Sequence, residues 1–486
     1  MIFSRRNVLA ASAALPFISG CARAAAGQVT LTIDQTRSGG MIFPDYMGLG
    51  YEISSVAIPG LLSAKNAPYV QLVRNLGRNK YQDRRGVIRI GGNTSDFSTY
   101  AANGTPVSSP KGTVVTEANL VELRGFLDEL RWNLIWGLNL GGDKLDNAVE
   151  EARAVDRILG DRLIAFEIGN EPDLFSRAGH RTADYNYDAW LKDYRRYKAA
   201  IRSVLPKARF AGPDLAGAAD WMTRFAQDEG QDIALLTAHH YIMGQTNPAA
   251  SQDVMLAEEK KYQGALATFR DASNAIHKNW RMCETASFSG GGKDGVSDTF
   301  AAALWVLDYL FVLASYGCCG VNMETGVNHL GKISYYTPIS DDLNGHYGAA
   351  PEYYGLLAFA QLSDGGMSPV AVAANGINLT AWSVVSKGER ALAIINKDTA
   401  QDADVSITGI DMVGPDITPN ARMTRGRAMR LTGPALNAKD DLKLGGVSVA
   451  ADGSWTGAKT EPVKVANGGA SLHVPAASAA LVWLSA

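Results

Sequence analysis

The chain has 486 residues, of which 46% are hydrophobic and 20% are charged, a composition typical of a globular protein with a large buried core. Its formal net charge of −3 gives no basis for a nucleic-acid partner, and we expect none. This length suits two to four domains, or one large barrel with a smaller module.

The first 25 residues have the pattern of a targeting segment. Arg5 and Arg6 precede an apolar run from Val8 to Ile18, which is too short to cross a bilayer and is typical of an export signal. Twin arginines indicate the route that exports folded proteins. Two processing sites stay open: a lipobox-like "ISGC" that would lipidate Cys21, and the small-residue sequence "ARA". We therefore expect an exported protein, either periplasmic or lipid-anchored at the bacterial envelope.

Apolar runs then alternate with amphipathic runs along the chain. This alternation predicts parallel βα units, and eight such units close into a (β/α)8 barrel, with a doubly wound sheet as the alternative. The clearest helices are expected at 117–132, 187–205 and 297–317, where apolar residues recur at spacings of three and four. The expected strands are 46–54, 87–95, 133–142, 163–172, 209–217, 235–243, 280–291 and 319–327.

The pattern changes near residue 364. Short β-like runs separated by Gly, Pro, Asn and Asp predict a β-sandwich, and the strand-like "QVTLTID" at 28–34 is expected to join it, because a lone strand is not stable. The chain is predicted to divide into a signal segment at 1–25, an N-terminal strand of the sandwich at 26–40, the barrel at 41–363 and the sandwich at 364–486.

Two glutamates follow apolar strands at positions suited to catalysis. Active groups of such barrels lie at the carboxyl ends of the strands. Glu171 ends the fourth strand, where Pro172 stops the hydrogen-bond ladder, and Glu284 lies near the end of the seventh. Two such carboxyls facing one gap fit a retaining glycosidase, in which one protonates the leaving oxygen and the other attacks the anomeric carbon.

Other strand-end acids have different expected roles. Glu167 points to the same side as Glu171 but lies deeper, and we expect it to pair with Arg89 in the barrel core. Glu324 also ends a strand and is the main rival for a catalytic role. No metal-ligand spacing or cofactor motif is present, so we expect neither a metal nor a cofactor.

Several polar residues near the two glutamates have two interpretations each. Asn170 is either a turn former or a hydrogen-bond partner of the sugar 2-OH. His239 is a candidate core histidine, whereas Tyr241 is a candidate donor to Glu284, which would lower the pKa of that group. The Gly-rich 287–295 lacks the spacing of a phosphate loop; it is either a flexible loop or a place where backbone N–H groups approach an anionic sugar substituent.

At these residues the chain resembles glycoside hydrolase family 79, the β-glucuronidase and heparanase family. The stretches that carry the resemblance are "RIGGNTSDF", "FEIGNEPDLF", "AGPDLAG", "HHYIM", "CETASFSGGG" with the "SDTFAAALWVLD" that follows it, and "APEYYGLLAFAQL".

The resemblance implies a retaining enzyme that acts on β-linked glucuronic acid, with Glu171 as acid/base and Glu284 as nucleophile. It also implies a set of sugar contacts: Asn170 at the 2-OH, Tyr241 beside Glu284, Glu52 and Asn93 at hydroxyls, and the amides of Gly290 and Gly291, with Ser289 and Tyr335, at the substrate carboxylate. One position departs from the family, because Ser289 stands where the family often has a tyrosine that touches this carboxylate.

The acidic charge favours an enzyme that removes terminal glucuronate from glycans or glycoconjugates. Three alternatives stay open beside this function. Endo cleavage of a sulfated heparan-like polymer would favour a basic cleft. The densest basic stretch, 74–85, precedes the second strand and is expected on the far face of the barrel. The others are a different glycosidase with the same barrel, such as an arabinofuranosidase or xylosidase, and a lipoprotein that binds glycan without cutting it.

Overall fold

A computed structural model describes residues 26–77, 86–257, 260–327, 331–362, 364–386, 388–412 and 421–486. The predicted signal segment with Arg5, Arg6 and Cys21 lies outside these residues, as do residues 78–85 of the basic stretch. None of the helices within the described ranges is long and apolar enough to cross a membrane.

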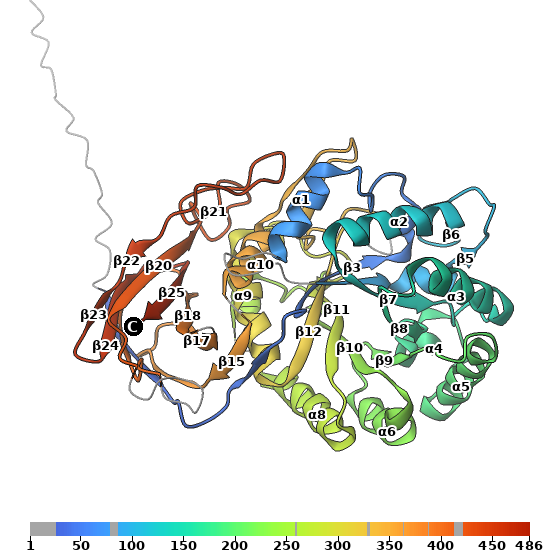
Figure 1. Cartoon of the computed structure of the whole chain (residues 1–486), viewed down its shortest axis with the longest axis horizontal. Helices are drawn as coiled ribbons and strands as arrows, with labels where there is room; N and C mark the ends of the chain where they lie inside the picture. The colour runs from blue at the N-terminus through green and yellow to red at the C-terminus, as the bar shows by residue number, and fades with distance from the viewer. Residues whose placement is uncertain are drawn as a thin grey trace, which may run out of the picture.

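Eight parallel strands form the barrel, and each overlaps one of the eight strands expected from the sequence (Figure 1). Each strand pairs with its neighbours in chain order, and the last pair meets through a parallel bridge between Phe166 and Phe210, which brings the sheet nearly to closure. The predicted fold class is therefore confirmed. The strands are β3 (Met47–Glu52), β4 (Val87–Gly91), β7 (Asn133–Leu138), β8 (Leu163–Ile168), β9 (Ala211–Leu215), β10 (Leu235–Gly244), β11 (Trp280–Ser289) and β12 (Cys318–Glu324).

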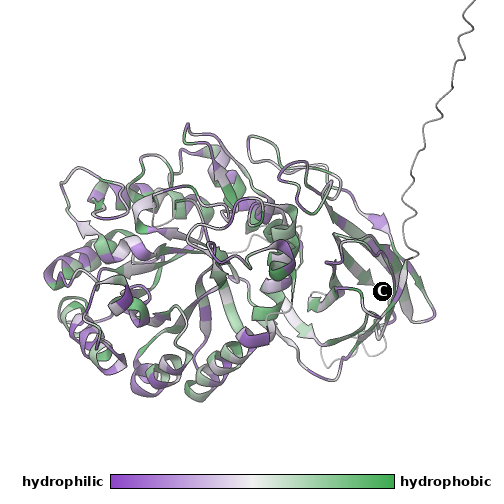
Figure 2. Ribbon diagram, turned by 180° about the vertical axis from the view of Figure 1, so that it is seen from behind, coloured by the Kyte–Doolittle hydropathy of each residue, from purple (hydrophilic) through white to green (hydrophobic). Residues whose placement is uncertain are grey.

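Helices surround the barrel and turn their hydrophilic faces outward (Figure 2). Their apolar faces pack on the strands, as the spacing of apolar residues requires. The helices are α1 (Ala67–Leu76), α2 (Glu117–Leu130), α3 (Leu145–Leu159), α4 (Phe175–Ala178), α5 (Tyr187–Val204), α6 (Ala219–Glu229), α7 (Gln252–Leu256), α8 (Lys260–Ile276), α9 (Phe300–Ser315) and α10 (Pro351–Gln361). Short strands in the connections are β5 (Thr99–Tyr100), β6 (Val114–Val115), β13 (Ile339–Asp341) and β14 (Tyr347–Ala349).

The second domain is a sandwich of two sheets that also takes residues from the N-terminal side of the barrel. β1 (Gly27–Ile33) lies between β16 and β19, as expected for 28–34. A second segment, β2 (Gly40–Ile42), pairs with β15, so the sandwich extends two residues past the predicted boundary at 40. The remaining strands are β15 (Gly365–Ser368), β16 (Val370–Ala373), β17 (Leu379–Ser386), β18 (Glu389–Asn396), β19 (Ala403–Thr408), β20 (Arg425–Thr432), β21 (Lys443–Leu444), β22 (Glu461–Pro462), β23 (Lys464–Ala466), β24 (Gly469–Val474) and β25 (Ser478–Ser485).

One sheet of the sandwich is buried on both faces. In β18, Leu392 and Ile394 point into the sandwich core, whereas Ala393 and Ile395 pack on the barrel side. Because alternate residues of a strand face opposite sides, burial on both faces produces the nearly continuous apolar run of this strand. Helix α9, which packs against this sheet, is also covered on both sides and is therefore buried along almost its whole length.

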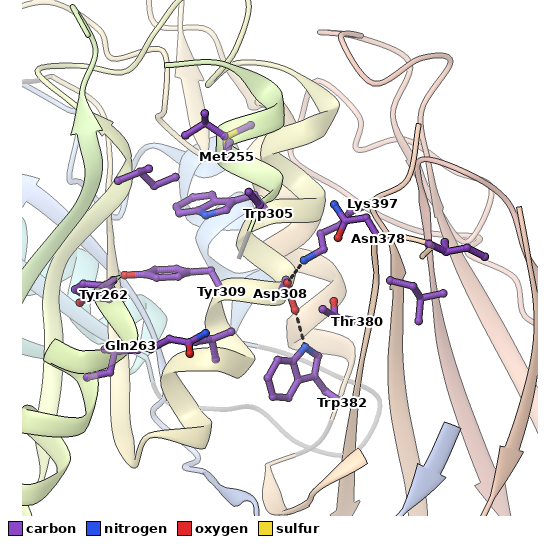
Figure 3. Close-up of a pocket in the computed structure, with 17 residues that line it drawn as sticks. Met255, Tyr262, Gln263, Trp305, Asp308, Tyr309, Asn378, Thr380, Trp382 and Lys397 are labelled. Carbon is purple, nitrogen blue, oxygen red and sulfur yellow. Dashed lines mark hydrogen bonds and ion pairs between the residues drawn. The ribbon is translucent and has the colours of Figure 1, made fainter. Parts of the chain in front are cut away.

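The contact between the two domains includes a charged hydrogen-bonded group beside a cavity of about 360 Å³ (Figure 3). Asp308 of α9 accepts a hydrogen bond from the Trp382 indole at 2.7 Å and pairs with the Lys397 ammonium at 2.5 Å. Both partners belong to the β domain, and the Lys397 side chain is only 6% exposed. The domains are therefore joined by a buried ion pair as well as by apolar packing.

Candidate active site

A cavity of about 450 Å³ opens at the carboxyl ends of the barrel strands. Its lining comes from the segments after β8 and β9, from β10 and β11, and from the segment after β12, and it is completed by Glu52 at the end of β3 and Asn93 after β4. The lining residues are Glu52, Asn93, Glu171, Leu174, Arg177, Ala216, Tyr241, Met243, Gly244, Glu284, Ser289, Gly290 and Tyr336.

Glu171 leaves the end of β8 in a left-handed backbone conformation, with φ of 51°, directly before Pro172. Its N–H donates to the carbonyl of Asp214 at 3.0 Å, which fixes the turn against β9. The carboxyl lies 3.1 Å from Nδ1 of His239 and its side chain is 12% exposed, so it borders the cavity. Burial raises the pKa of Glu171, and the negative charge of Glu284 adds to the rise against the opposing His239 hydrogen bond. This carboxyl is suited to hold a proton.

Glu284 lies within β11 and is almost fully buried. The Tyr241 hydroxyl donates to its Oε1 at 2.8 Å, and the Arg89 guanidinium donates to its Oε2 at 2.8 Å. Burial opposes the charged form, but the positive charges of His239 and Arg89, with the Tyr241 hydrogen bond, outweigh it and lower the pKa of Glu284. This carboxyl is suited to stay ionised.

The two glutamates face each other across a short gap. One carboxylate oxygen of Glu171 lies within 4.8 Å of one of Glu284. This agrees with the separation of about 5–5.5 Å at which one carboxyl can attack a sugar carbon while the other protonates the leaving oxygen.

A buried network beneath the glutamates holds them in place. Arg89 of β4 donates from Nε to Glu167 at 2.9 Å, from Nη1 to Glu284, and from Nη2 to Asp214 at 2.6 Å and to Asn170 at 2.9 Å. The predicted pair of Glu167 with Arg89 is therefore confirmed. Burial works against ionisation of Asp214, but Arg89 and His239 outweigh it and lower the pKa of Asp214 to about 2.

His239 connects this network to Glu171. Its Nε2 lies 2.7 Å from Asp214 and its Nδ1 lies 3.1 Å from Glu171, so both ring nitrogens face carboxylates. Burial opposes the charged ring, but Asp214 and Glu284 outweigh it and raise the pKa of His239 well above its usual range. Among the described residues, Glu171, His239 and Glu284 form the one cluster with metal-ligand geometry.

Five of the predicted sugar contacts line the cavity with the two glutamates: Glu52, Asn93, Tyr241, Ser289 and Gly290. Asn170 is buried beside Glu171, and its Nδ2 has no hydrogen-bond partner in the described part of the chain, which leaves a donor for a ligand. Glu52 accepts hydrogen bonds from the amides of Asn93 and Thr94. Burial, with the charge of Glu284, raises the pKa of Glu52 to about 8.

The Gly-rich loop after β11 reaches the cavity with Ser289 and Gly290. Gly290 and Gly291 have φ of 85° and 103°, a backbone conformation that side chains rarely adopt. The N–H of Tyr335 donates to the Gly291 carbonyl at 2.6 Å. Tyr335 itself is 46% exposed and does not line the cavity, whereas Tyr336 does. Tyr336 therefore lies in the cavity lining, where Tyr335 was expected.

Four residues of the site have positions that were not predicted from the sequence. Asp214 and the ion-paired role of His239 depend on contacts between β9 and β10, which no local pattern encodes. The stretch "GPDL" at 212–215, with an acid at a strand end, was the available signal for Asp214. Tyr336 lies on a loop and Arg177 in the four-residue helix α4, and neither segment has a periodicity that indicates which side chain faces the cavity.

The barrel with its β domain is a fold that solved glycoside hydrolase structures share. Residues 381–481 match the model of the glycosyl hydrolase family 79 C-terminal beta domain. A beta-glucuronidase of Neurospora crassa is 27% identical over 374 residues, which cover 68% of this chain and 66% of that protein. The matched C-terminal domain and the beta-glucuronidase similarity support the resemblance to glycoside hydrolase family 79.

A second relative and a solved structure are also similar to the chain. A heparanase of Rattus norvegicus is 29% identical over 162 residues, which cover 32% of this chain and 30% of that protein. The crystal structure of a 4-O-alpha-L-rhamnosyl-beta-D-glucuronidase from Fusarium oxysporum 12S superposes with a TM-score of 0.76 at 19% identity, covering 93% of this chain and 99% of that one. This structure shares the fold. The match to the Neurospora protein spans just under two thirds of its length.

Proposed function

We propose that the chain is a retaining β-D-glucuronidase that removes terminal β-linked glucuronic acid from glycans or glycoconjugates. The observation that carries this proposal is the pair of Glu171 and Glu284, which lie within 4.8 Å of each other and whose pKa values are shifted in opposite directions. The similarity to proteins named beta-glucuronidase supports the choice of sugar.

In the first step, the ionised Glu284 attacks the anomeric carbon while the protonated Glu171 gives its proton to the glycosidic oxygen. The bond to the aglycone breaks, and the aglycone leaves as an alcohol. Arg89 and Tyr241 keep Glu284 ionised and oriented for this attack. The free Nδ2 of Asn170 donates to the sugar 2-OH, a contact that strengthens in the transition state.

In the second step, Glu171 has lost its proton and acts as a base. It takes a proton from a water molecule, whose oxygen attacks the anomeric carbon and releases Glu284. Two inversions give net retention of the β configuration. Activity therefore requires Glu284 ionised and Glu171 protonated, which predicts a bell-shaped dependence of kcat/KM on pH.

The charge around the cavity favours exo action over cleavage of a sulfated polymer. Among the described lining residues, Arg177 is the one basic side chain, whereas Glu52, Glu171 and Glu284 are acidic. A polyanionic chain would need more positive charge than this lining offers. The similarity to heparanases makes a heparan-type polymer the alternative substrate to test.

We also propose that the protein is exported and is either periplasmic or anchored through Cys21. The support is the sequence of residues 1–25, with its twin arginines and short apolar run. Substituting Arg5 and Arg6 by lysine is expected to retain the protein in the cytoplasm, and Cys21→Ala to release an anchored form into the soluble fraction. Fractionation of cells expressing each variant checks both expectations.

Hydrolysis of nitrophenyl β-glucuronide, compared with the β-glucoside, the β-xyloside and the α-arabinofuranoside, tests the proposed function. We expect the glucuronide to have the highest kcat/KM by about tenfold or more. A preference for any of the other three would refute the proposed sugar. A digest of heparan-type oligosaccharides then distinguishes exo from endo action, because exo action releases only monosaccharide.

A further inference from the structure

Tyr309 of α9 joins the two strands that carry Tyr241 and Glu284, from outside the active-site cavity. Its hydroxyl oxygen lies 2.9 Å from Nδ1 of His240 on β10 and 3.0 Å from Oγ1 of Thr285 on β11. The Thr285 hydroxyl in turn donates to the His240 carbonyl at 2.7 Å. These three residues are buried, and the proposed mechanism gives them no role. We call them the Tyr309 cluster.

The contacts of the Tyr309 cluster form a closed ring of hydrogen bonds. The single hydroxyl hydrogen of Thr285 goes to the His240 carbonyl, so the Tyr309 hydroxyl donates to Oγ1 of Thr285. The Tyr309 oxygen then accepts a hydrogen bond from Nδ1–H of His240. Each contact thus has one donor and one acceptor. Because buried hydrogen bonds of this kind make the groups that they join rigid, the ring fixes β10, β11 and α9 to one another.

The cluster lies directly behind the catalytic side chains, on the outer face of the barrel. Alternate residues of a strand point to opposite faces. Glu284 lines the cavity, and the next residue, Thr285, points the other way toward α9. Tyr241 lines the cavity, and His240 before it also points toward α9. His240 and Thr285 are opposite each other in the pairing of β10 with β11, so the cluster joins the two strands beside both functional residues.

The cluster also follows an irregularity in β11. Between Met282 and Thr285, β11 has one residue more than β10 and one residue more than β12. Such a β-bulge interrupts the ladder of backbone hydrogen bonds and changes the direction of a side chain. Glu284 lies within this interval, so the ladder holds its backbone less firmly than it holds a regular strand. The hydrogen bonds of Thr285, the next residue, anchor the backbone there.

We propose that Tyr309 is a positioning residue for the nucleophile Glu284; the inference rests on the proposed function. The Tyr309 hydroxyl acts through Thr285 and His240, which hold β11 and β10 together beside the bulge. In this register the Glu284 carboxylate lies 2.8 Å from the Tyr241 hydroxyl and faces the cavity. A displacement of about 1 Å in a reacting group can lower a rate about a hundredfold, so the loss of this anchor slows the attack on the anomeric carbon.

The rate at which Glu284 forms a covalent adduct measures this positioning. With 2-deoxy-2-fluoro-β-glucuronyl fluoride, the bond from Glu284 to the anomeric carbon forms as fluoride leaves, and fluoride needs little help from an acid. We expect Tyr309→Phe to lower the maximal rate constant of inactivation about 10- to 100-fold. The inhibitor concentration that gives half of this rate should not change, because Tyr309 does not line the cavity. Mass spectrometry of the intact protein over time, at several inhibitor concentrations, gives both values.

Tyr46→Phe is the matched control. Tyr46 is also buried, and its hydroxyl donates at 2.7 Å to the Leu310 carbonyl of the same helix α9. It lies just before the first residue of β3, whereas the cavity opens at the carboxyl ends of the strands. We expect Tyr46→Phe to lower the melting temperature, as Tyr309→Phe does, but to keep the native rate constant of inactivation.

Two substitutions of Thr285 test the same contact from its other side. Thr285→Val removes the hydroxyl at nearly the same volume, whereas Thr285→Ser keeps the hydroxyl. We expect Thr285→Val to slow inactivation as Tyr309→Phe does, and Thr285→Ser to recover most of the lost rate. The double variant Tyr309→Phe, Thr285→Val is expected to lose less than the product of the two single losses, because the two changes share one contact.

The outcomes distinguish this inference from the proposed function. A native rate constant of inactivation in Tyr309→Phe would overturn the inference. So would an equal loss in Tyr46→Phe, because any weakening of the contacts of α9 would then have the same effect. A Thr285→Ser variant as slow as Thr285→Val would also overturn it. In these three cases a wild type that forms the adduct on Glu284 leaves the proposed function in place, whereas a wild type with no adduct on Glu284 refutes the proposed mechanism and the inference together.

Discussion

Glu171 and Glu284 carry the same side chain, yet their surroundings give them opposite acidities. Glu284 receives hydrogen bonds from Arg89 and Tyr241 and lies near the charged His239. Glu171 is mostly buried, and its side chain has one hydrogen-bond partner among the described residues, the His239 ring. Because hydrogen bonds and positive charge stabilise a carboxylate and burial destabilises it, the division of roles follows from partners and not from residue type.

Glu171→Ala tests the acid role at the scale of one residue. We expect kcat/KM for a substrate with a poor leaving group, such as a methyl or alkyl β-glucuronide, to fall by about 10²- to 10⁴-fold. A dinitrophenyl leaving group needs little protonation, so the first step should be much less affected for it. Steady-state and burst kinetics on the two substrates make the comparison. Equal losses on both would exclude Glu171 as the general acid.

His239→Gln removes the positive charge between the two glutamates but keeps a hydrogen-bonding side chain. Without that charge, the pKa of Glu284 is expected to rise, which moves the acidic limb of the kcat/KM profile to higher pH. The pKa of Glu171 is also lowered by His239 in the native protein, so the alkaline limb is expected to move in the same direction. A pH–rate profile from pH 3 to 9 checks this, and unmoved limbs would contradict a charged His239.

The glutamate pair could be predicted from the sequence, whereas the residues that tune it could not. An apolar strand followed by Glu-Pro, and a second strand with a glutamate before a Gly-rich loop, are local patterns. The bonds from Asp214 to His239 and from Arg89 to Glu284 join different strands of the closed barrel. Such contacts depend on strand register, which the sequence alone does not provide. The cavity-facing Tyr336 was missed by one residue because its segment has no regular periodicity.

At the scale of elements, the site depends on how β8 ends. Gly169 has φ of 81°, and Glu171 adopts a left-handed conformation two residues later, so the chain turns sharply, Glu171 borders the cavity and Asn170 accepts a hydrogen bond from Arg89. A glycine allows the first of these turns without steric cost. The apolar strands themselves could be predicted because each is a short apolar run between loop signals. β2 could not, because three residues carry too little pattern.

Gly169→Ala tests this turn. A Cβ at residue 169 would lie 2.9 Å from Cβ of Leu140, and φ of 81° is strained for alanine. We expect a loss of stability of roughly 1–2 kcal/mol, together with a lower kcat/KM, because Asn170 and Glu171 are displaced. Gly179→Ala is a useful comparison, since it has the same φ but no atom within 4 Å of the added Cβ. A Gly169→Ala enzyme with native kcat/KM would show that the turn does not position the acid.

At the scale of the whole molecule, the β domain is integrated with the barrel. Apolar residues on both faces of β18 and β25 belong to two different cores, one inside the sandwich and one shared with the barrel. The continuous apolar runs "ALAII" and "AALVWL" were a signal of burial on both faces, but which face meets which domain is a property of the folded chain. β1 and β2 further connect the start of the chain to this domain.

Asp308→Ala tests the interface between the domains. The substitution leaves the Lys397 ammonium buried without its carboxylate and removes the partner of the Trp382 indole. We expect the free energy of unfolding to fall by about 3 kcal/mol, measured by denaturant titration, with kcat/KM of the folded enzyme unchanged. The double variant Asp308→Leu, Lys397→Met is expected to recover part of the loss. If Asp308→Ala alone were as stable as the native protein, the ion pair would not hold the domains together.

Trapping the covalent intermediate tests the central claim most directly. A 2-deoxy-2-fluoro-β-glucuronyl fluoride forms a covalent adduct with a retaining enzyme. The adduct is hydrolysed slowly, because the 2-fluoro substituent destabilises the transition states of both steps. Mass spectrometry of a proteolytic digest is predicted to show one glucuronyl adduct per chain, located on Glu284. Inactivation with the adduct on Glu171 or Glu324, or turnover of the natural β-glucuronide with no adduct and initial release of α-glucuronate, would contradict the mechanism.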